Sequence, residues 1–247
     1  MTTKSDEQVA IEELEDCLLS MDDEYQTQVS LLPLFQEEAT RGLTAEKKRQ
    51  LAGVLYHIRG HFHDFLWYLA NFAPDSKSKQ MILRNISEEL GGNRMSHEAM
   101  YGVFASEFGI DIHQEIIDGE HDLDFVKSFN KEHMIWLASH DWCGRLSAFS
   151  AYERLDNIDY INLYRMAEAI GTSAEGLVFF DVHREVTHFQ STLKILKDSW
   201  LNQSESVLNG FRFIYQHQLE MWSDLSKLIF SEADNFKQTP VSVASLA

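Results

Sequence analysis

The sequence contains few cysteines, basic residues and prolines, and each shortage excludes some classes of protein or fold. Only two cysteines are present, Cys17 and Cys143, so we expect no disulfide framework and a reducing, cytoplasmic location. No apolar run reaches the ~18 residues that a membrane-spanning helix needs. The N-terminus also lacks the basic and then apolar order of a signal peptide. We therefore expect a soluble, cytoplasmic protein without a membrane partner.

Basic residues are scarce as well. Lys and Arg number 21 against 39 Asp and Glu, which gives a formal net charge of −18. Nucleic acids and anionic membranes bind proteins through basic surfaces, and an acidic excess of this size opposes both. The charge balance therefore argues against a nucleic-acid partner, and its simplest meaning is a self-repelling surface.

Strand patterns are missing too. No run of alternating Val, Ile and Thr persists, and the chain has only three prolines. Apolar residues at spacings of three and four instead predict an all-α fold with about seven main helices and some shorter ones. We expect a single helical domain over residues 1–235 and a loose tail at 236–247, where no helical or core pattern continues.

The periodicity also places the helices. Residues 6–41 predict two short amphipathic helices with a break near Met21–Asp22. A capped start at "LTAEKK" predicts one long helix that ends at "APDSK", and the next helix stops at the paired glycines 91 and 92. Another helix begins at Ser96, and further patterns cover about 123–139, 144–155, 158–170, 173–198 and 204–231.

Three ligand-type side chains fall on apolar faces of separate predicted helices. Glu89 shares a face with Ile82, His97 lines up with Phe104, and Glu153 follows a core-facing stripe. A carboxylate on a core face is costly to bury unless it is paired or bound to a cation. Oxygen and imidazole ligands from facing helices suit iron or manganese. Together these residues predict a metal site, although each alone is typical of a hydrogen-bonded core residue.

Three stretches, in order, resemble the heme-oxygenase-like di-iron oxidases. They are "NISEELGGNRMSHEAMYGVFASEFG", "AYE" at 151–153 and "FFDVHREVTHFQS", and the resemblance extends over about residues 45–200. It implies a heme-oxygenase-like helical bundle, a homodimer, and two ferrous ions that activate dioxygen. The expected substrate is a small organic molecule such as an amino acid or fatty acid derivative. Carried over by position, Glu89, His97 and Glu153 would be metal ligands.

The third stretch admits two registers. The family's helix carries H-x3-D-x2-H, and aligning it on "FF-x-x-H-x-E-V" makes His183 the first histidine. Thr187 and Gln190 then stand where the family has an aspartate and a second histidine. Because neither is a good iron ligand, the resemblance leaves open whether one or two irons bind, and whether iron or manganese is used.

The second register rests on helical spacing. Asp181, Glu185 and His188 lie at i, i+4 and i+7, so they share one helix face. We favour His183 as a ligand because of the local resemblance, with His188 or Glu185 completing a second metal site. The alternative is that the Asp181, Glu185 and His188 face points inward.

Other residues suggest further roles or other functions. Tyr152 precedes Glu153 and would have a redox role by resemblance to the branch linked to p-aminobenzoate formation. Cys143 supports an alternative, a metal-free hydrolase or small-molecule-binding protein resembling the thiaminase-II-like branch. A protein–protein scaffold is a third possibility. His57 and His61 have a chelating i, i+4 spacing, but a position lining a pocket or on a partly exposed face is the expected one.

Overall fold

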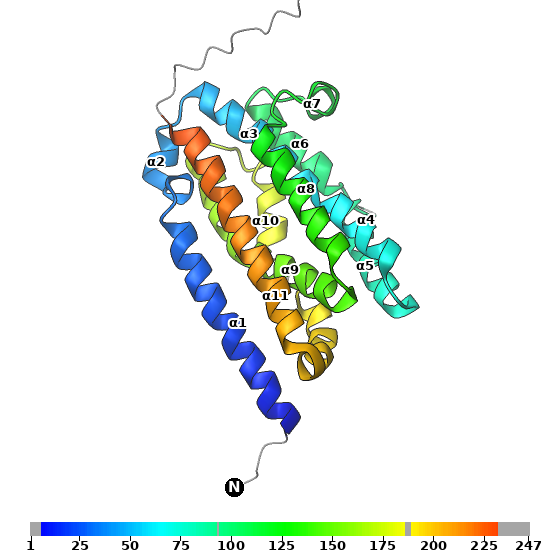
Figure 1. Cartoon of the computed structure of the whole chain (residues 1–247). Coiled ribbons are helices and arrows are strands. Elements are labelled where there is room, and N and C mark those ends of the chain that lie inside the picture. Colours follow the sequence, from blue (N-terminus) through cyan, green and yellow to red (C-terminus); the bar gives the residue numbers. More distant parts are fainter. Residues whose placement is uncertain (1–5, 93, 186–188, 232–247) are drawn as a thin grey trace, which may run out of the picture.

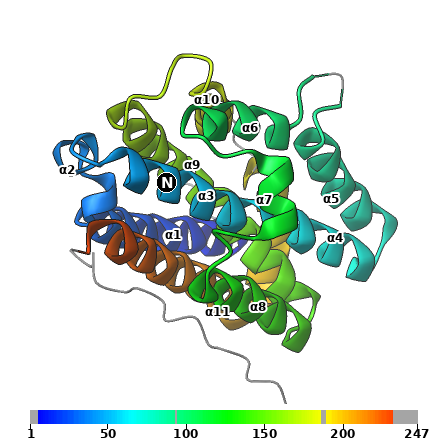
Figure 2. The same ribbon diagram turned by 90° about the horizontal axis from the view of Figure 1, so that it is seen from above.

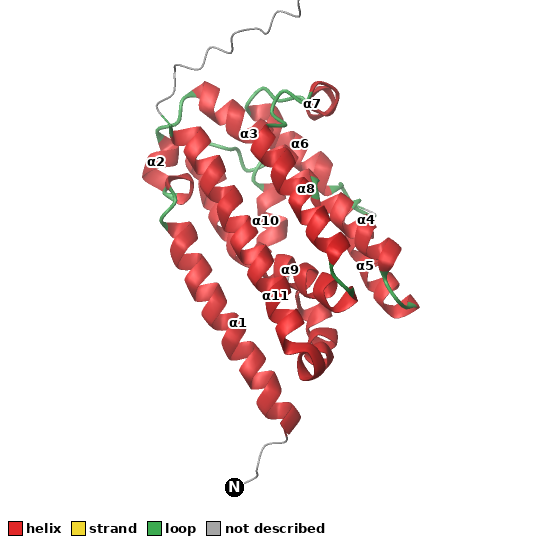
Figure 3. Cartoon of the chain, in the orientation of Figure 1, coloured by secondary structure: helices red, strands yellow, loops and turns green. Residues whose placement is uncertain are grey.

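The computed structural model describes residues 6–92, 94–185 and 189–231. Within these ranges every regular element is a helix, as Figure 3 shows, which confirms the predicted all-α class. In chain order the helices are α1 (Asp6–Ser30), the 3-10 helix η1 (Pro33–Phe35), α2 (Glu37–Arg41), α3 (Ala45–Gly60), α4 (Phe62–Phe72), α5 (Ser76–Glu89), α6 (His97–Glu107), α7 (Ile112–Asp118), α8 (Asp124–Ser139), α9 (Trp142–Ala169), α10 (Val178–Glu185) and α11 (Phe189–Phe230). None of the helices in the described part of the chain is both long and apolar enough to cross a membrane.

Helix α9 is central to the packing (Figures 1 and 2). It contacts α11 and α10 extensively and also meets α1, α4 and α8. Asp141 caps its first turn by accepting a hydrogen bond from the backbone N–H of Gly144 at 3.0 Å. Near this end α11 approaches so closely that a Cβ atom on Gly210 would lie 2.7 Å from the Ser147 side chain. Close packing on several sides buries some of the polar residues of α9, among them Glu153 and Asp159, inside the bundle.

Two predicted breaks are wrong. Helix α1 runs unbroken through Met21–Asp22, and α9 is one helix where the sequence predicted separate helices at 144–155 and 158–170. Asp22 accepts a hydrogen bond from Nε of Arg154 at 2.9 Å and another from the Tyr215 hydroxyl. The polar residue that looked like a helix end is therefore used in a tertiary contact.

One predicted continuous helix is also wrong, and another begins later than predicted. The long helix after Thr44 divides at His61 into α3 and α4, although His61 keeps right-handed helical torsions of φ −59° and ψ −23°. The helix predicted at 173–198 begins instead at Val178 with α10, and α11 covers its second part from Phe189, whereas residues 186–188 between them lie outside the description. Helix α11 then bends at Gln203, where φ is −146°, close to the start predicted at 204. The predicted tail at 236–247 lies outside the described residues.

Three histidines lie together in the core, and we call them the histidine cluster: His61, His133 and His217. The ring centroids of His61 and His133 are 5.4 Å apart, and those of His133 and His217 are 5.9 Å apart. Burial lowers the pKa of His61 to about 4, and it also lowers the pKa values of His133 and His217. Neither ring nitrogen of His133 has a hydrogen-bond partner within the described structure. The cluster is therefore uncharged at neutral pH.

Candidate metal centre

Glu89 and His97 are brought together by the turn between α5 and α6. Glu89 is the last residue of α5 and His97 the first of α6. Gly91 lies in the turn at φ +85°, where a Cβ atom would come within 2.6 Å of backbone atoms of Arg94 and Ser96. Ser96 then caps α6 by accepting a hydrogen bond from the next turn. As a result, Nδ1 of His97 lies 2.9 Å from Oε2 of Glu89.

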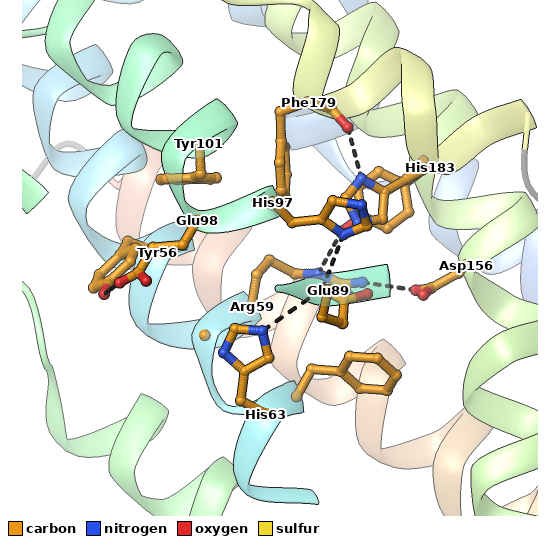
Figure 4. A pocket seen from close by; sticks show the side chains of 13 residues that line it. Tyr56, Arg59, His63, Glu89, His97, Glu98, Tyr101, Asp156, Phe179 and His183 are labelled. Carbon is orange, nitrogen blue, oxygen red and sulfur yellow. Dashed lines mark hydrogen bonds and ion pairs between the residues drawn. The ribbon is translucent and has the colours of Figure 1, made fainter. Parts of the chain in front are cut away.

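His183 reaches the same place from α10. Its ring centroid is 4.4 Å from that of His97, and its ring stacks on Tyr160 at 4.2 Å with an interplanar angle of 9°. Nδ1 of His183 lies 2.6 Å from the backbone carbonyl oxygen of Phe179 (Figure 4). A carbonyl oxygen only accepts, so we assign the proton to Nδ1, which leaves the lone pair on Nε2. This hydrogen bond is typical of metal-binding histidines.

The three side chains have the geometry and chemistry of a metal site. One ligand atom from each of Glu89, His97 and His183 lies within 4.8 Å of the others. Burial, followed by the charge of His97, lowers the pKa of His183 to about 3, so its imidazole is neutral at physiological pH. Two imidazoles and one carboxylate form the donor set that non-heme ferrous enzymes use. The residues therefore fit an iron ion.

The charge of Glu89 is stabilised by two histidines. Burial alone would raise its pKa, but the interactions with His63 and His97 outweigh burial and hold the pKa well below the usual range. Nε2 of His63 lies 3.7 Å from Oε2 of Glu89, which is an ion-pair distance, and the interaction with this carboxylate raises the pKa of His63. Glu89 is thus an anion ready to accept a cation. No pattern in the sequence indicates that His63 belongs to this site.

Two carboxylates of α9 face the same centre. Glu153, which is 3% exposed, and Asp156 line a small cavity together with Glu89, His97 and His183. The side-chain amide of Asn85 donates to Glu153 at 3.4 Å. Burial, and then the nearby charges of Asp156 and Glu89, raise the pKa of Glu153 well above its usual value. Glu153 points inward as the sequence predicted, but it lies outside the tight group of three ligands.

Arg59 is a second residue that the sequence did not single out. It ends α3 next to Gly60, and its Nη2 donates to Oδ1 of Asp156 at 2.7 Å while its Nε donates to the Tyr160 hydroxyl at 3.1 Å. The guanidinium also lies over the Tyr160 ring, 4.7 Å from its centroid. A fixed positive charge therefore lies beside the candidate metal ligands.

A larger pocket opens next to these residues (Figure 4). Its volume is about 90 Å³, and it adjoins the small cavity because both are lined by Glu89, His97 and His183. Five of the residues that line it are Phe or Tyr: Tyr56, Phe62, Tyr101, Tyr160 and Phe179. Such a pocket can bind the apolar body of a small molecule against the metal centre.

Several predicted site residues are not brought to this centre. Tyr152 lines neither cavity; it is buried against Phe62, with the two rings stacked 4.8 Å apart. Asp181 is 44% exposed and pairs with Arg184, so the described member of the second register points outward.

Four residues that the two registers use lie wholly or partly outside the description. The side chains of Glu185 and Gln190 are not described, nor are Thr187 and His188 at all. The predicted second metal site in this segment therefore stays a prediction.

The remaining candidates have other partners. His57 lies 2.8 Å from the buried Glu115, which also accepts from His121, while His61 belongs to the histidine cluster. His57 and His61 therefore do not converge on one point.

Cys143 is buried in the first turn of α9, ten residues or about 15 Å before Glu153. It lines neither cavity, so the geometry gives no support to a cysteine nucleophile at this centre.

Comparisons with known proteins agree with this picture. The structure resembles a domain of unknown function with a heme oxygenase-like fold from Shewanella denitrificans OS217, with a TM-score of 0.68. The two share 15% sequence identity, over 87% of this chain and 92% of the other, so the likeness shows the fold alone. No protein of curated function matches the chain. Residues 49–216, more than half of the sequence, match a family described as iron-containing redox enzymes, and the chain therefore belongs to that family.

Proposed function

We propose that this protein is a non-heme iron enzyme that uses dioxygen to oxidise a small organic molecule. The observation that carries the proposal is the convergence of Glu89, His97 and His183, whose ligand atoms lie within 4.8 Å of one another. This donor set lies beside an aromatic pocket, in a chain that belongs to a family of iron-containing redox enzymes. A ferrous ion in this position would supply open coordination positions for dioxygen.

The surrounding residues prepare the site for that chemistry. The Phe179 carbonyl fixes the tautomer of His183, and stacking on Tyr160 fixes the plane of its ring. The aromatic wall excludes water and binds the substrate by contact, close to the ligand atoms. His63 pairs with Glu89 and lines the pocket, so it can hold a proton for transfer to or from the substrate.

Metal analysis tests the proposal directly. The chain would be reconstituted with ferrous iron without oxygen, desalted and analysed for metal, alone and in competition with manganese. We expect iron to be retained by the wild type and lost from His97→Ala and His183→Ala, because each removes one of three ligands. His113→Ala is the matched control, since His113 is exposed on α7. Circular dichroism would establish that the variants remain folded.

A second readout addresses dioxygen. Nitric oxide binds ferrous iron at positions open to dioxygen, so the reconstituted protein should give the paramagnetic resonance signal of a ferrous–nitrosyl complex. That signal should be absent from folded His183→Ala. Failure of the wild type to retain iron or manganese would refute the proposed function.

A further inference from the structure

Gly60 lines the larger pocket, and neither its backbone nor its packing requires a glycine. It is the last residue of α3, and its φ lies outside the positive range in which a side chain is strained. A Cβ atom built at this position would meet no packing partner within 4 Å. Gly53 in the same helix differs, because a Cβ atom there would lie 2.3 Å from the His121 ring. Since glycine forms helices less well than alanine, Gly60 has a cost in stability that no contact in the described structure explains.

The missing side chain would lie between two other residues of the pocket. Tyr56, Gly60 and His63 are spaced at i, i+4 and i+7, and all three line the pocket (Figure 4). His61 keeps helical torsions at the junction of α3 and α4, so the three residues share one face across the junction. A gap therefore separates the side chains of Tyr56 and His63, over the Cα atom of Gly60.

The two sides of this gap are held by carboxylates. The Tyr56 hydroxyl donates to Oε1 of Glu98 at 3.1 Å, and Nε2 of His63 lies 3.7 Å from Oε2 of Glu89. Gly60 and Glu98 are exposed to solvent, whereas only 13% of the Glu89 side chain is exposed. The pocket therefore opens to solvent over Gly60, and the opening leads inward to the candidate metal ligands.

The enclosed space is small compared with most ligands. Its volume is about 90 Å³, whereas ligand pockets commonly measure roughly 300–1,000 Å³. A molecule that binds against the metal ligands would therefore occupy the opening as well as the enclosed space. Because hydrogen-bonded and ion-paired side chains border the opening, its width limits the shape of that molecule.

We propose that Gly60 is a specificity-determining residue: its missing side chain leaves the opening of the pocket, which admits slender molecules and excludes branched ones. The matching substrate is a small molecule with an unbranched alkyl segment or a flat aromatic ring that lies over Gly60. This statement about the substrate rests on the proposed function, whereas the position of the opening does not depend on a bound metal.

Acylation of histidines by two reagents of different width tests the opening. The full-length chain would be freed of metal with a chelator and treated with diethyl pyrocarbonate or with the branched di-tert-butyl dicarbonate, and peptide mapping by mass spectrometry would give the rate at each histidine. His183 is the reporter, because it lines the pocket and its Nε2 carries a free lone pair. Exposed His113 on α7 is the internal reference. In the wild type we expect His183 to react with the diethyl reagent, and its rate relative to His113 to be several-fold lower with the branched reagent.

Substitutions at Gly60 separate filling of the gap from other effects. Gly60→Leu should lower the relative rate of His183 with the diethyl reagent several-fold, because the leucine side chain fills the gap, and Gly60→Ala should lower it less. Alanine and leucine both favour the helix, so equal slowing by the two would indicate a stiffer helix and refute the role of the gap. Gly102→Leu is the matched control: Gly102 lies on α6 in a separate groove, where a Cβ atom would be 3.9 Å from Ile112, and its rates should equal those of the wild type.

Several results would overturn the inference. One is a wild-type His183 that does not react with the diethyl reagent, or that reacts equally well with both reagents relative to His113. Another is a folded Gly60→Leu variant that reacts as fast as the wild type. If circular dichroism shows that Gly60→Leu does not fold, the comparison of the two reagents in the wild type still decides, and so does an unchanged rate in Gly60→Ala, which would count against the gap. Because no iron is present, the proposed function is tested separately by metal analysis, and either proposal can fail without the other.

Discussion

Replacing His133 by leucine should make the protein more stable, and the gain should grow in acid. His133 is fully buried, and both of its ring nitrogens lack partners among the described residues. An unpartnered buried polar group costs about 1–3 kcal/mol, and leucine has a similar volume without that cost. At pH 7.5 the free energy of unfolding of His133→Leu should therefore exceed that of the wild type by about 1–3 kcal/mol.

The acid dependence follows from proton linkage. Burial, followed by the charges of His61 and His217, lowers the pKa of His133 well below 6.5 in the folded state. Below pH 6.5 the unfolded chain binds a proton at this residue and the folded chain does not, so its contribution to stability falls as pH falls. The loss is about 1.4 kcal/mol per pH unit, or about 2 kcal/mol at pH 5. Leucine binds no proton, so the advantage of the variant should widen by that amount.

Urea unfolding followed by circular dichroism at pH 7.5 and pH 5.0, with a chelator present, measures both effects. His113→Leu is the control, because His113 is exposed on α7 and its replacement should not change the pH dependence in this way. A His133→Leu variant that is less stable than the wild type at both pH values would contradict the reasoning. So would a constant difference between the two pH values, because the histidine would then be protonated or partnered in the folded protein.

Three other substitutions test the fold and the site. Gly91→Ala should weaken iron binding about 10-fold or more by disturbing the turn that joins the first two ligands, whereas Gly92→Ala, at φ +50° with no atom within 3.8 Å of its Cβ position, should have less effect in the same iron titration. Gly210→Ala should lower the melting temperature by about 4–8 °C, since about 2 kcal/mol of overpacking is expected; an unchanged value in calorimetry would contradict the close approach of α9 and α11. Burial raises the pKa of Asp159 to about 7, so the folded wild type binds a proton that the unfolded chain loses above pH 3.8, and wild-type stability falls as pH rises towards 7. Asp159→Asn lacks this penalty, and its stability relative to the wild type should increase by up to about 4 kcal/mol between pH 4 and 7 in urea titrations.

The candidate metal ligands Glu89 and His97 could be recognised from the sequence because each has a local signal. Glu89 lies on an apolar stripe that ends at paired glycines, and His97 follows a capping serine. Both residues belong to one short stretch with a turn in the middle, so the sequence predicts that they lie close in space. The inward position of Glu153 followed from periodicity in the same way, and the structure buries it. These signals depend only on residues within one or two helical turns.

Arg59 and Asp156 could not be found in this way. They lie on α3 and α9, far apart in the sequence, and only the packing of those helices brings them within 2.7 Å. In the sequence each is typical of a solvent-facing polar residue on an amphipathic helix. The helix break predicted near Asp22 was wrong for a related reason. Asp22 pairs with Arg154, and the local sequence does not reveal this contact. Tertiary contacts override the local preference in each case.

The three candidate ligands are unequally spaced along the chain. Glu89 and His97 are neighbours across one turn, but His183 belongs to the short helix α10, which leads directly to residues 186–188 outside the described structure. An ion held by all three would close a loop that runs from position 89 to position 183, and such a link removes freedom mainly from the unfolded chain. A bound ion would therefore stabilise the position of α10 against the turn between α5 and α6. Loading the protein with iron should protect this helix from proteolysis, in addition to supplying the metal for the reaction.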